Sequence, residues 1–146
     1  MKWGMRHRSM IVVAIVALFA TSCVSPHASV VTDVNPDGWT DRATMTYCNA
    51  DTTSLCDMNL FLRCDDSFAE DTLTVRFAIC TPDSLRFEEP FRLVLPHTNS
   101  PAALRREVVV TYRHRVRLLR AGNYYITITP VRPVQGVEAV GVTLSM

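Results

Sequence analysis

From residue 39 onward, apolar and polar residues alternate in short runs, which is the pattern of half-buried β-strands. Leu73, Val75 and Phe77, for example, are each separated by one residue. Similar runs occupy 43–47, 58–63, 91–95, 105–119, 124–129 and 137–144, with turn-forming residues between most of them. No stretch after residue 23 keeps the apolar spacing of a helix for long enough to predict one. The pattern predicts seven or eight strands in an all-β fold, a single antiparallel β-sandwich of jelly-roll-like organisation.

The first 22 residues have a different pattern, that of a secretory signal peptide. Basic residues within 2–8 precede an unbroken apolar run from Met10 to Ala20, and Thr21-Ser22-Cys23 follows. Such a run rises about 16 Å as a helix, well short of the roughly 30 Å hydrocarbon core of a bilayer. The order basic, apolar, small predicts export. Residues 20–23 also resemble the lipobox of bacterial lipoproteins, whose cysteine is acylated, although Leu is commoner at the position of Ala20. The alternative is an ordinary signal peptide with an incidental Cys23.

We therefore expect a signal peptide over 1–22, a lipidated tether over 23–38 and a β-sandwich domain over 39–146. The tether is small and polar around Val30-Val31, with room for one early strand, and ends in a turn-forming Asn-Pro-Asp-Gly sequence. After residue 22 the chain has no lysine, and 12 arginines oppose 14 acids. Acyl chains on Cys23 would anchor the protein to a membrane of the bacterial cell envelope, with inner and outer membrane left open.

Besides the lipobox cysteine, the sequence contains Cys48, Cys56, Cys64 and Cys80. Export would place them in an oxidising compartment, where four cysteines permit two disulfides in three connectivities. If the segment 49–55 is a hairpin loop, Cys48 and Cys56 come together, and Cys80 reaches the same end from an adjacent antiparallel strand. Cys64 is one strand length from Cys56 and is the hardest to place. We expect at least one disulfide among Cys48, Cys56 and Cys80, with free thiols as the alternative.

The sequence after the signal has no linear signature of catalysis or of metal or cofactor binding. It lacks a Gly-x-Ser-x-Gly elbow, a His-Glu-x-x-His motif, a Gly-rich phosphate loop and a Cys-x-x-Cys pair. The acidic pairs at 65–66 and 88–89 lack the spacing of a calcium loop. His114 shares strand parity with apolar neighbours, which favours a half-buried core residue over a ligand. We expect no enzyme, cofactor or metal, and the net charge of +1 argues against a nucleic-acid partner.

Arginine is concentrated in the last third of the chain, where seven arginines oppose two acids from Pro101 onward. On a strand, Arg113, Arg115 and Arg117 project from one face. Three guanidinium groups in a row cannot be buried without partners. Either an acidic pair such as 65–66 or 88–89 neutralises them within the molecule, or they form a surface that docks an acidic partner or phosphate-bearing lipid headgroups.

The C-terminal segment resembles the gliding-motility-associated lipoproteins of the GldH family. That family ends with a Gly-x-Tyr strand, an arginine and a closing strand between glycines, as at Gly122-Asn-Tyr124, Arg132, Gly136 and Gly141. Residues 60–63 and 73–75, Trp39 and the lipoprotein signal also fit, whereas the four further cysteines and Phe68-Ala69 depart from the family pattern. The resemblance implies an envelope lipoprotein with a β-sandwich body, accessory to gliding motility or to its associated protein-export apparatus.

Two functions remain. The first is a non-enzymatic structural or assembly subunit, attached to the membrane through its lipid and bound to envelope proteins. The second is a lipid-anchored module whose end loops bind a glycan or another small ligand. The aromatic residues available for a glycan are Trp39, Tyr124 and Tyr125, each of which could equally be a core or sheet-face residue. The first function is favoured because the sequence carries a lipobox and no catalytic motif.

Overall fold

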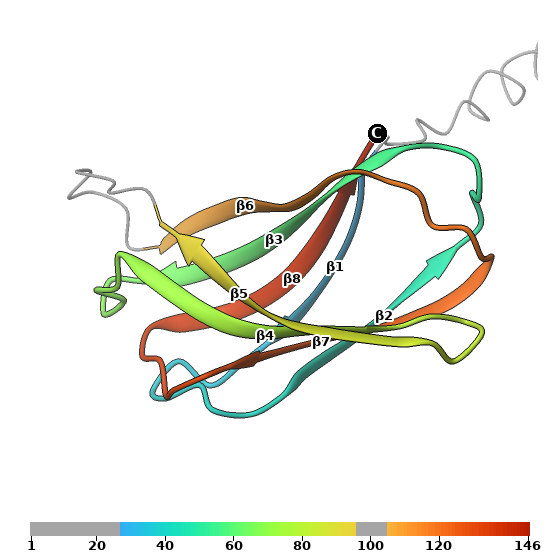
Figure 1. The fold of residues 1–146 in the computed structure, drawn as a ribbon. Coiled ribbons are helices and arrows are strands. Elements are labelled where there is room, and N and C mark those ends of the chain that lie inside the picture. The colour runs from blue at the N-terminus through green and yellow to red at the C-terminus, as the bar shows by residue number, and fades with distance from the viewer. Residues whose placement is uncertain (1–26, 96–104) are drawn as a thin grey trace, which may run out of the picture.

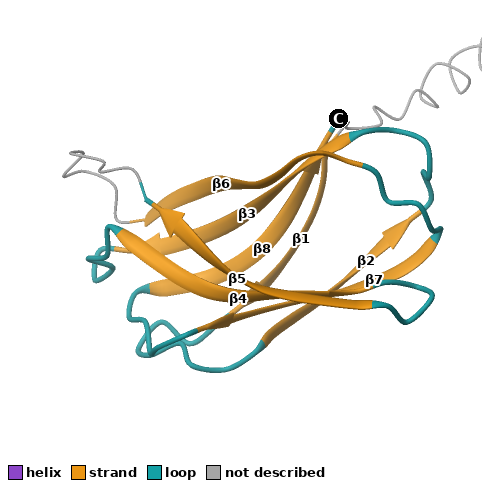
Figure 2. Ribbon diagram, viewed as in Figure 1, coloured by secondary structure: helices purple, strands orange, loops and turns teal. Residues whose placement is uncertain are grey.

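The computed structural model describes residues 27–95 and 105–146. Two four-stranded antiparallel sheets pack face to face (Figure 1), and these residues contain no helix (Figure 2), so none is long and apolar enough to cross a membrane. The strands are β1 (His27–Asp33), β2 (Ala43–Asn49), β3 (Cys56–Asp65), β4 (Thr72–Cys80), β5 (Arg86–Val94), β6 (Arg105–Val116), β7 (Gly122–Pro130) and β8 (Val137–Ser145). The all-β sandwich predicted from the alternation of residues is confirmed.

The strands follow the order of a jelly roll. The first sheet has the order β1-β8-β3-β6 and the second sheet the order β2-β7-β4-β5. Only β4 and β5 are consecutive strands that pair with each other, so every other connection crosses from one sheet to the other. This alternation between sheets joins strands that are far apart in sequence, as in other jelly rolls.

The core lies between the sheets because alternate residues of each strand point inward. Leu60, Val140 and Val142 from the first sheet meet Val75, Phe77 and Ile126 from the second, all at most 2% exposed. Trp39, 1% exposed, joins this core from the segment between β1 and β2, and its indole Nε1 donates to the backbone oxygen of Asp41 at 2.7 Å.

The sandwich includes residues that the sequence assigned to the tether. β1 pairs with β8 along its whole length, from His27 opposite Ser145 to Asp33 opposite Ala139. The sandwich therefore contains His27–Asp33, which the sequence assigned to the tether over 23–38. The predicted signal peptide and Cys23 lie outside the described residues.

Three loops and the start of β1 meet at one end of the sandwich, which we call the proximal end. In the first sheet, His27 and Asp57 both lie opposite Ser145, and Cys56 lies opposite Val116. In the second sheet the corresponding strand ends are Asn49, Cys80, Arg86 and Gly122. The loops 50–55 and 117–121 cross between the sheets here, and the loop 81–85 joins β4 to β5 (Figure 1).

The predicted disulfide is wrong, since Cys48, Cys56, Cys64 and Cys80 are all free. The segment 50–55 is a crossover between sheets and not a hairpin loop, so Cys48 and Cys56 lie on sheets that pack about 10 Å apart. Cys48 and Cys80 do share a sheet, but β7 runs between their strands. Two strand spacings, about 9.6 Å, exceed the Cα separation that a disulfide tolerates.

Candidate functional site

The three arginines predicted to form one docking face do not share a face. Arg115 has a left-handed backbone with φ of 54°, and the pairing of β3 with β6 is irregular near Met58. Both features break the alternation that placed the three side chains together. β6 ends at Val116, so Arg117 belongs to the following loop. The predicted arginine face is therefore corrected: Arg113 and Arg117 border one hollow between β5 and β6, and Arg115 is not among the residues that line it.

Arg113 has an acidic partner inside the molecule. Its Nη2 donates to Oε1 of Glu89 at 2.6 Å, and the Tyr112 hydroxyl donates to the same oxygen. Tyr112 also contacts Phe77 and Phe91, with ring centroids 4.2 and 5.1 Å apart, so this group links the edge strand β6 to the second sheet. Both hydrogen bonds lower the pKa of Glu89, while burial and Glu89 raise the pKa of Tyr112 to about 12.

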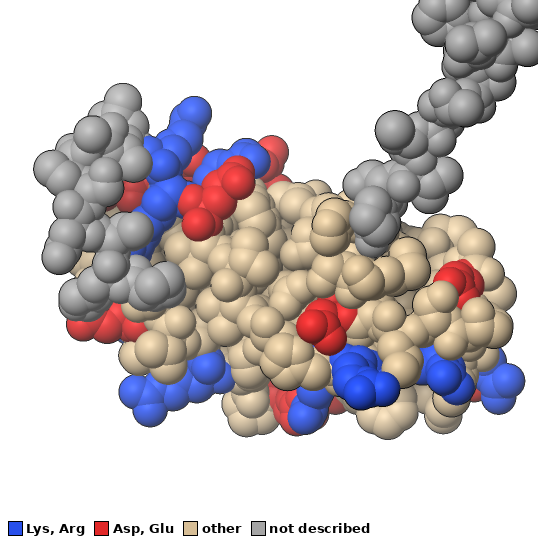
Figure 3. Space-filling model, turned by 90° about the horizontal axis from the view of Figure 1, so that it is seen from above, with Lys and Arg blue, Asp and Glu red and all other residues tan. Residues whose placement is uncertain are grey.

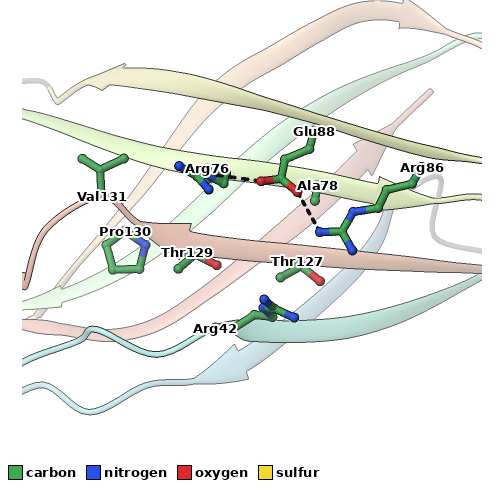
Figure 4. Close-up of a pocket in the computed structure, with 9 residues that line it drawn as sticks. All are labelled: Arg42, Arg76, Ala78, Arg86, Glu88, Thr127, Thr129, Pro130 and Val131. Carbon is green, nitrogen blue, oxygen red and sulfur yellow. Dashed lines mark hydrogen bonds and ion pairs between the residues drawn. The ribbon is translucent and has the colours of Figure 1, made fainter.

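A different arginine cluster lies on the outer face of the second sheet (Figure 4). A hollow of about 310 Å³ is lined there by Arg42, Arg76, Ala78, Arg86, Glu88, Thr127, Thr129, Pro130 and Val131. The strand register explains the grouping. Glu88, Ala78 and Thr127 lie opposite one another on three adjacent strands, and Arg76 lies opposite Thr129. The methyl group of Ala78, 6% exposed, leaves space that a longer side chain would fill.

The hollow has more positive than negative charge. Oε2 of Glu88 accepts from Nη2 of Arg86 at 2.7 Å, and Oε1 lies 3.4 Å from Nε of Arg76. The hydrogen bond from Arg86 is the main cause of the lowered pKa of Glu88, and the charges of Arg86, Arg76 and Arg42 add to it. Arg42 makes no hydrogen bond or ion pair with a described residue, so three guanidinium groups oppose one carboxylate. The arrangement suits an anionic group such as a carboxylate, sulfate or phosphate.

A second hollow opens at the proximal end, between the edge strands β5 and β6. It measures about 1000 Å³ and is bounded by these strands and by the loops 81–85 and 117–121. Figure 1 shows β5 and β6 diverging toward this end. Leu85, Phe87 and Leu119 at its margin are 55, 63 and 67% exposed.

The outer face of the first sheet is largely uncharged at its centre. Figure 3 shows acids and arginines gathered toward one end of this face. Two ion pairs belong to that end, Arg63 with Glu107 at 3.2 Å and Arg105 with Glu138 at 3.0 Å. Between them and the proximal end, Val109, Phe61, Gly141 and Val31 form a row across four strands. The guanidinium of Arg63 lies over the Phe61 ring in this row, 5.8 Å from its centroid.

The remaining candidate residues are mostly structural. Trp39 and Tyr124 are 1% and 4% exposed, so neither offers a ring to a glycan, whereas Tyr125 is 49% exposed on the face that carries the arginine hollow. His114 is exposed, and not half-buried as predicted, with Nδ1 3.2 Å from Oδ2 of Asp57. The alternation of inward and outward residues does not hold at His114, because the backbone is irregular at the neighbouring Arg115. Among the described residues, no three His, Cys, Asp or Glu side chains are grouped to hold a metal ion.

Sequence reasoning missed the arginine hollow. The alternation in β4 does place Arg76 on the polar face, because its neighbours Val75 and Phe77 are apolar. Arg42 and Arg86 are 34 and 10 residues away, and only the order β2-β7-β4-β5 brings all three together. No family model matches the chain, and no curated protein matches it.

Proposed function

We propose that this protein is a cell-envelope lipoprotein, anchored through Cys23, that acts as a non-enzymatic assembly subunit by docking an acidic partner protein. The observation that carries the proposal is the arginine hollow, in which Arg42, Arg76 and Arg86 oppose only Glu88. The docking surface moves from the predicted face at Arg113, Arg115 and Arg117 to this sheet face. The resemblance to the GldH family supports an assembly role and leaves gliding motility as part of the proposal.

The sheet face around the hollow suits a protein surface. Its outward side chains include Thr44, Thr46, Thr127 and Thr129, which are short and keep the face flat. Thr44 and Thr127 lie opposite each other, with their hydroxyl oxygens 3.5 Å apart. A carboxylate that enters the hollow would therefore meet the hydroxyl groups of Thr127 and Thr129 on β7, with Arg42 on one side of them and Arg76 and Arg86 on the other (Figure 4). Hydrogen bonds to charged groups contribute about 1.5–3 kcal/mol each, less where solvent screens them.

The test compares two double variants of the lipidated protein in non-ionic detergent. Arg42→Ala with Arg76→Ala removes two charges from the hollow, and Arg63→Ala with Arg105→Ala removes two exposed charges from the other sheet. We expect the hollow variant to bind a poly-glutamate peptide about tenfold more weakly than the wild type, with the melting temperature nearly unchanged. Wild-type binding should weaken strongly as salt rises. Equal binding by the two variants would contradict the proposal.

An acidic glycan is the second candidate, and the exposed ring of Tyr125 favours it. Tyr125 lies opposite Cys80, which lies opposite Arg86, so ring and guanidinium share one row of the sheet. Aromatic faces and arginine together suit a sugar that carries a carboxylate. Saturable binding to acidic oligosaccharides that Tyr125→Ala abolishes, with poly-glutamate binding unchanged, would favour this candidate over a protein partner.

A further inference from the structure

The exposed apolar side chains of the described chain are concentrated at the proximal end. Ten large apolar side chains are exposed among the described residues, and five of them belong to this end: Leu55, Leu85, Phe87, Leu119 and Met146. They come from three loops, the start of β5 and the C-terminus. The opposite end has only Val94 and Val131 among the described residues. Apolar side chains clustered in this way indicate an interaction surface.

The loops that carry these side chains are fixed to one another. Asn49, 4% exposed, donates from Nδ2 to the backbone oxygens of Leu118 and Arg120 at 3.2 and 2.9 Å. The Tyr124 hydroxyl also donates to the oxygen of Arg120 at 3.1 Å. A Cβ on Gly122 would lie 3.2 Å from Pro82, so the loop 81–85 packs closely against the start of β7. The apolar tips therefore form a preorganised surface.

The same end receives the chain from the predicted lipid anchor. His27 is only four positions after Cys23, and four residue steps span at most about 14 Å. The strands are about 30 Å long, since nine residues rise about 3.3 Å each. An acylated Cys23 at a bilayer surface therefore keeps the proximal end near the lipid and permits the opposite end to be far from it.

We propose that the proximal end of the sandwich lies against the bilayer, with Leu85, Leu119 and their apolar neighbours in the headgroup region and Arg117 among lipid phosphates. The proposal rests on the anchor at Cys23 from the proposed function. Apolar side chains enter the boundary between headgroups and acyl chains favourably, and arginine is attracted to anionic lipid. In this orientation the arginine hollow, on a lateral face, stays accessible to a partner.

The charges of the proximal end permit this contact. Arg117 makes no hydrogen bond or ion pair with a described residue. The three acids nearby already hold hydrogen bonds: Asp51 accepts from Thr53 and Ser54, Asp57 from the backbone NH of Arg115, and Asp83 from Arg120. Arg115, Arg117 and Arg120 equal these three carboxylates in number, and Arg117 lines the second hollow together with Leu118 and Leu119.

The experiment places a tryptophan at three exposed positions of the lipidated protein in vesicles of phosphatidylcholine and phosphatidylglycerol. Leu119→Trp reports on the proximal end, Val131→Trp on the opposite end, and Val109→Trp on the outer face of the first sheet. Brominated acyl chains should quench Leu119→Trp at least twofold more than either control. Native Trp39 is buried and supplies the same background in all three.

Arg117 is tested within the Leu119→Trp protein. Arg117→Glu should reduce the quenching of Leu119→Trp in vesicles containing phosphatidylglycerol by about fivefold or more. Arg92→Glu, an equal reversal of charge on the second sheet, should leave this quenching unchanged. Equal quenching in the two reversal variants would overturn the assignment of Arg117 to the lipid phosphates.

The outcomes separate this inference from the anchor on which it depends. If the protein floats with the vesicles and Val109→Trp is quenched most, the molecule lies on its side and the inference is wrong. If the protein floats and no tryptophan is quenched, the proximal end does not contact the bilayer and is available to a protein partner. The inference is then again wrong. If the protein does not float, the anchor itself is wrong and the inference falls with it.

Discussion

The four described cysteines have the same side chain but very different surroundings. Cys48 is exposed on the outer face of β2, whereas Cys64 is 0% exposed within β3. Burial raises the pKa of Cys64 to about 11, and it raises the pKa of Cys56 less strongly. Because the thiolate is the reactive form, exposure favours reaction at Cys48, whereas burial and the raised pKa disfavour reaction at Cys64.

We therefore predict stepwise alkylation of the purified protein at pH 8. Cys48 should react first and Cys64 only after denaturation, with intact mass and peptide mapping as the measurement. Cys48→Ser should remove the fast phase and leave the protection of Cys64 unchanged. Because no disulfide is formed, omitting reductant should not reduce the number of modifiable thiols. Loss of two or more sites without reductant would contradict this prediction.

A single backbone conformation decides the direction of Arg115. Its positive φ lets its backbone NH reach Oδ1 of Asp57 at 2.8 Å, while His114 pairs with the other oxygen. Simple alternation along Arg113, Arg115 and Arg117 gives no sign of this turn. The alternation of residues predicts the direction of the side chains only where the strand is regular, as in β4.

At the scale of elements, β1 depends on one glycine of its neighbour. A Cβ on Gly141 would lie 2.4 Å from the backbone oxygen of Val30 and 2.8 Å from a methyl group of Val31. The contact is with backbone, which cannot move without separating the two strands. Gly141 is therefore required for β1 to pair with β8, and β1 is the strand that leads to the predicted anchor.

We predict that Gly141→Ala releases β1 and lowers the free energy of unfolding by about 2 kcal/mol or more. Hydrogen exchange should show lost protection in 27–33 and retained protection in β4 and β7. Gly38→Ala is the matched control, because a Cβ there meets nothing within 4 Å. Similar effects of the two substitutions on β1 would show that the close approach at Gly141 is unimportant.

The edge strand β5 shows how this fold limits unwanted pairing. β5 pairs only with β4, and Pro90 stands at its centre opposite Arg76. Proline has no NH to offer to a further strand, and the flanking Glu88 and Arg92 are charged. We therefore assign docking to the outer sheet face and not to addition of a strand at this edge.

At the scale of the whole molecule, folding pairs the two oppositely charged halves of the chain. Residues 23–100 carry an excess of acids, and residues from 101 onward an excess of arginines. Glu89 pairs with Arg113, Asp83 with Arg120, and Glu70 with Arg132 at 2.6 Å. The acids of the first part of the chain thus form ion pairs with arginines of the last part. The excess positive charge of the hollow has a different origin, because Arg42, Arg76 and Arg86 all belong to the first part.

The proposed lipid anchor would act on the whole molecule, and we predict that Cys23→Ser removes membrane attachment. Acyl chains contribute about 0.8 kcal/mol per buried CH₂, so two or three of them hold a protein stably on a bilayer. The wild type should partition into the detergent phase, and the variant into the aqueous phase. Cys48→Ser, which leaves the lipobox intact, should behave as the wild type. Unchanged membrane retention of the Cys23→Ser protein would show that the lipid is not the anchor.

The sequence determined the fold class because inward and outward positions along a strand are a local property. The alternation in 73–79 and 124–129 needs no knowledge of neighbouring strands. It also established that most arginines must lie outside the core. The sequence likewise predicts export and acylation, because a signal peptidase reads such a signal from a linear segment.

Only the tertiary structure decided which strands are neighbours, and the site depends on that choice. Cys48 and Cys56 flank a short segment, but the segment crosses between sheets, so nearness in sequence did not become a disulfide. Arg42, Arg76 and Arg86 are distant in sequence, but the order of the second sheet brings them together. The pairing of strands is set by burial of whole faces over many non-local contacts, and no short motif encodes it.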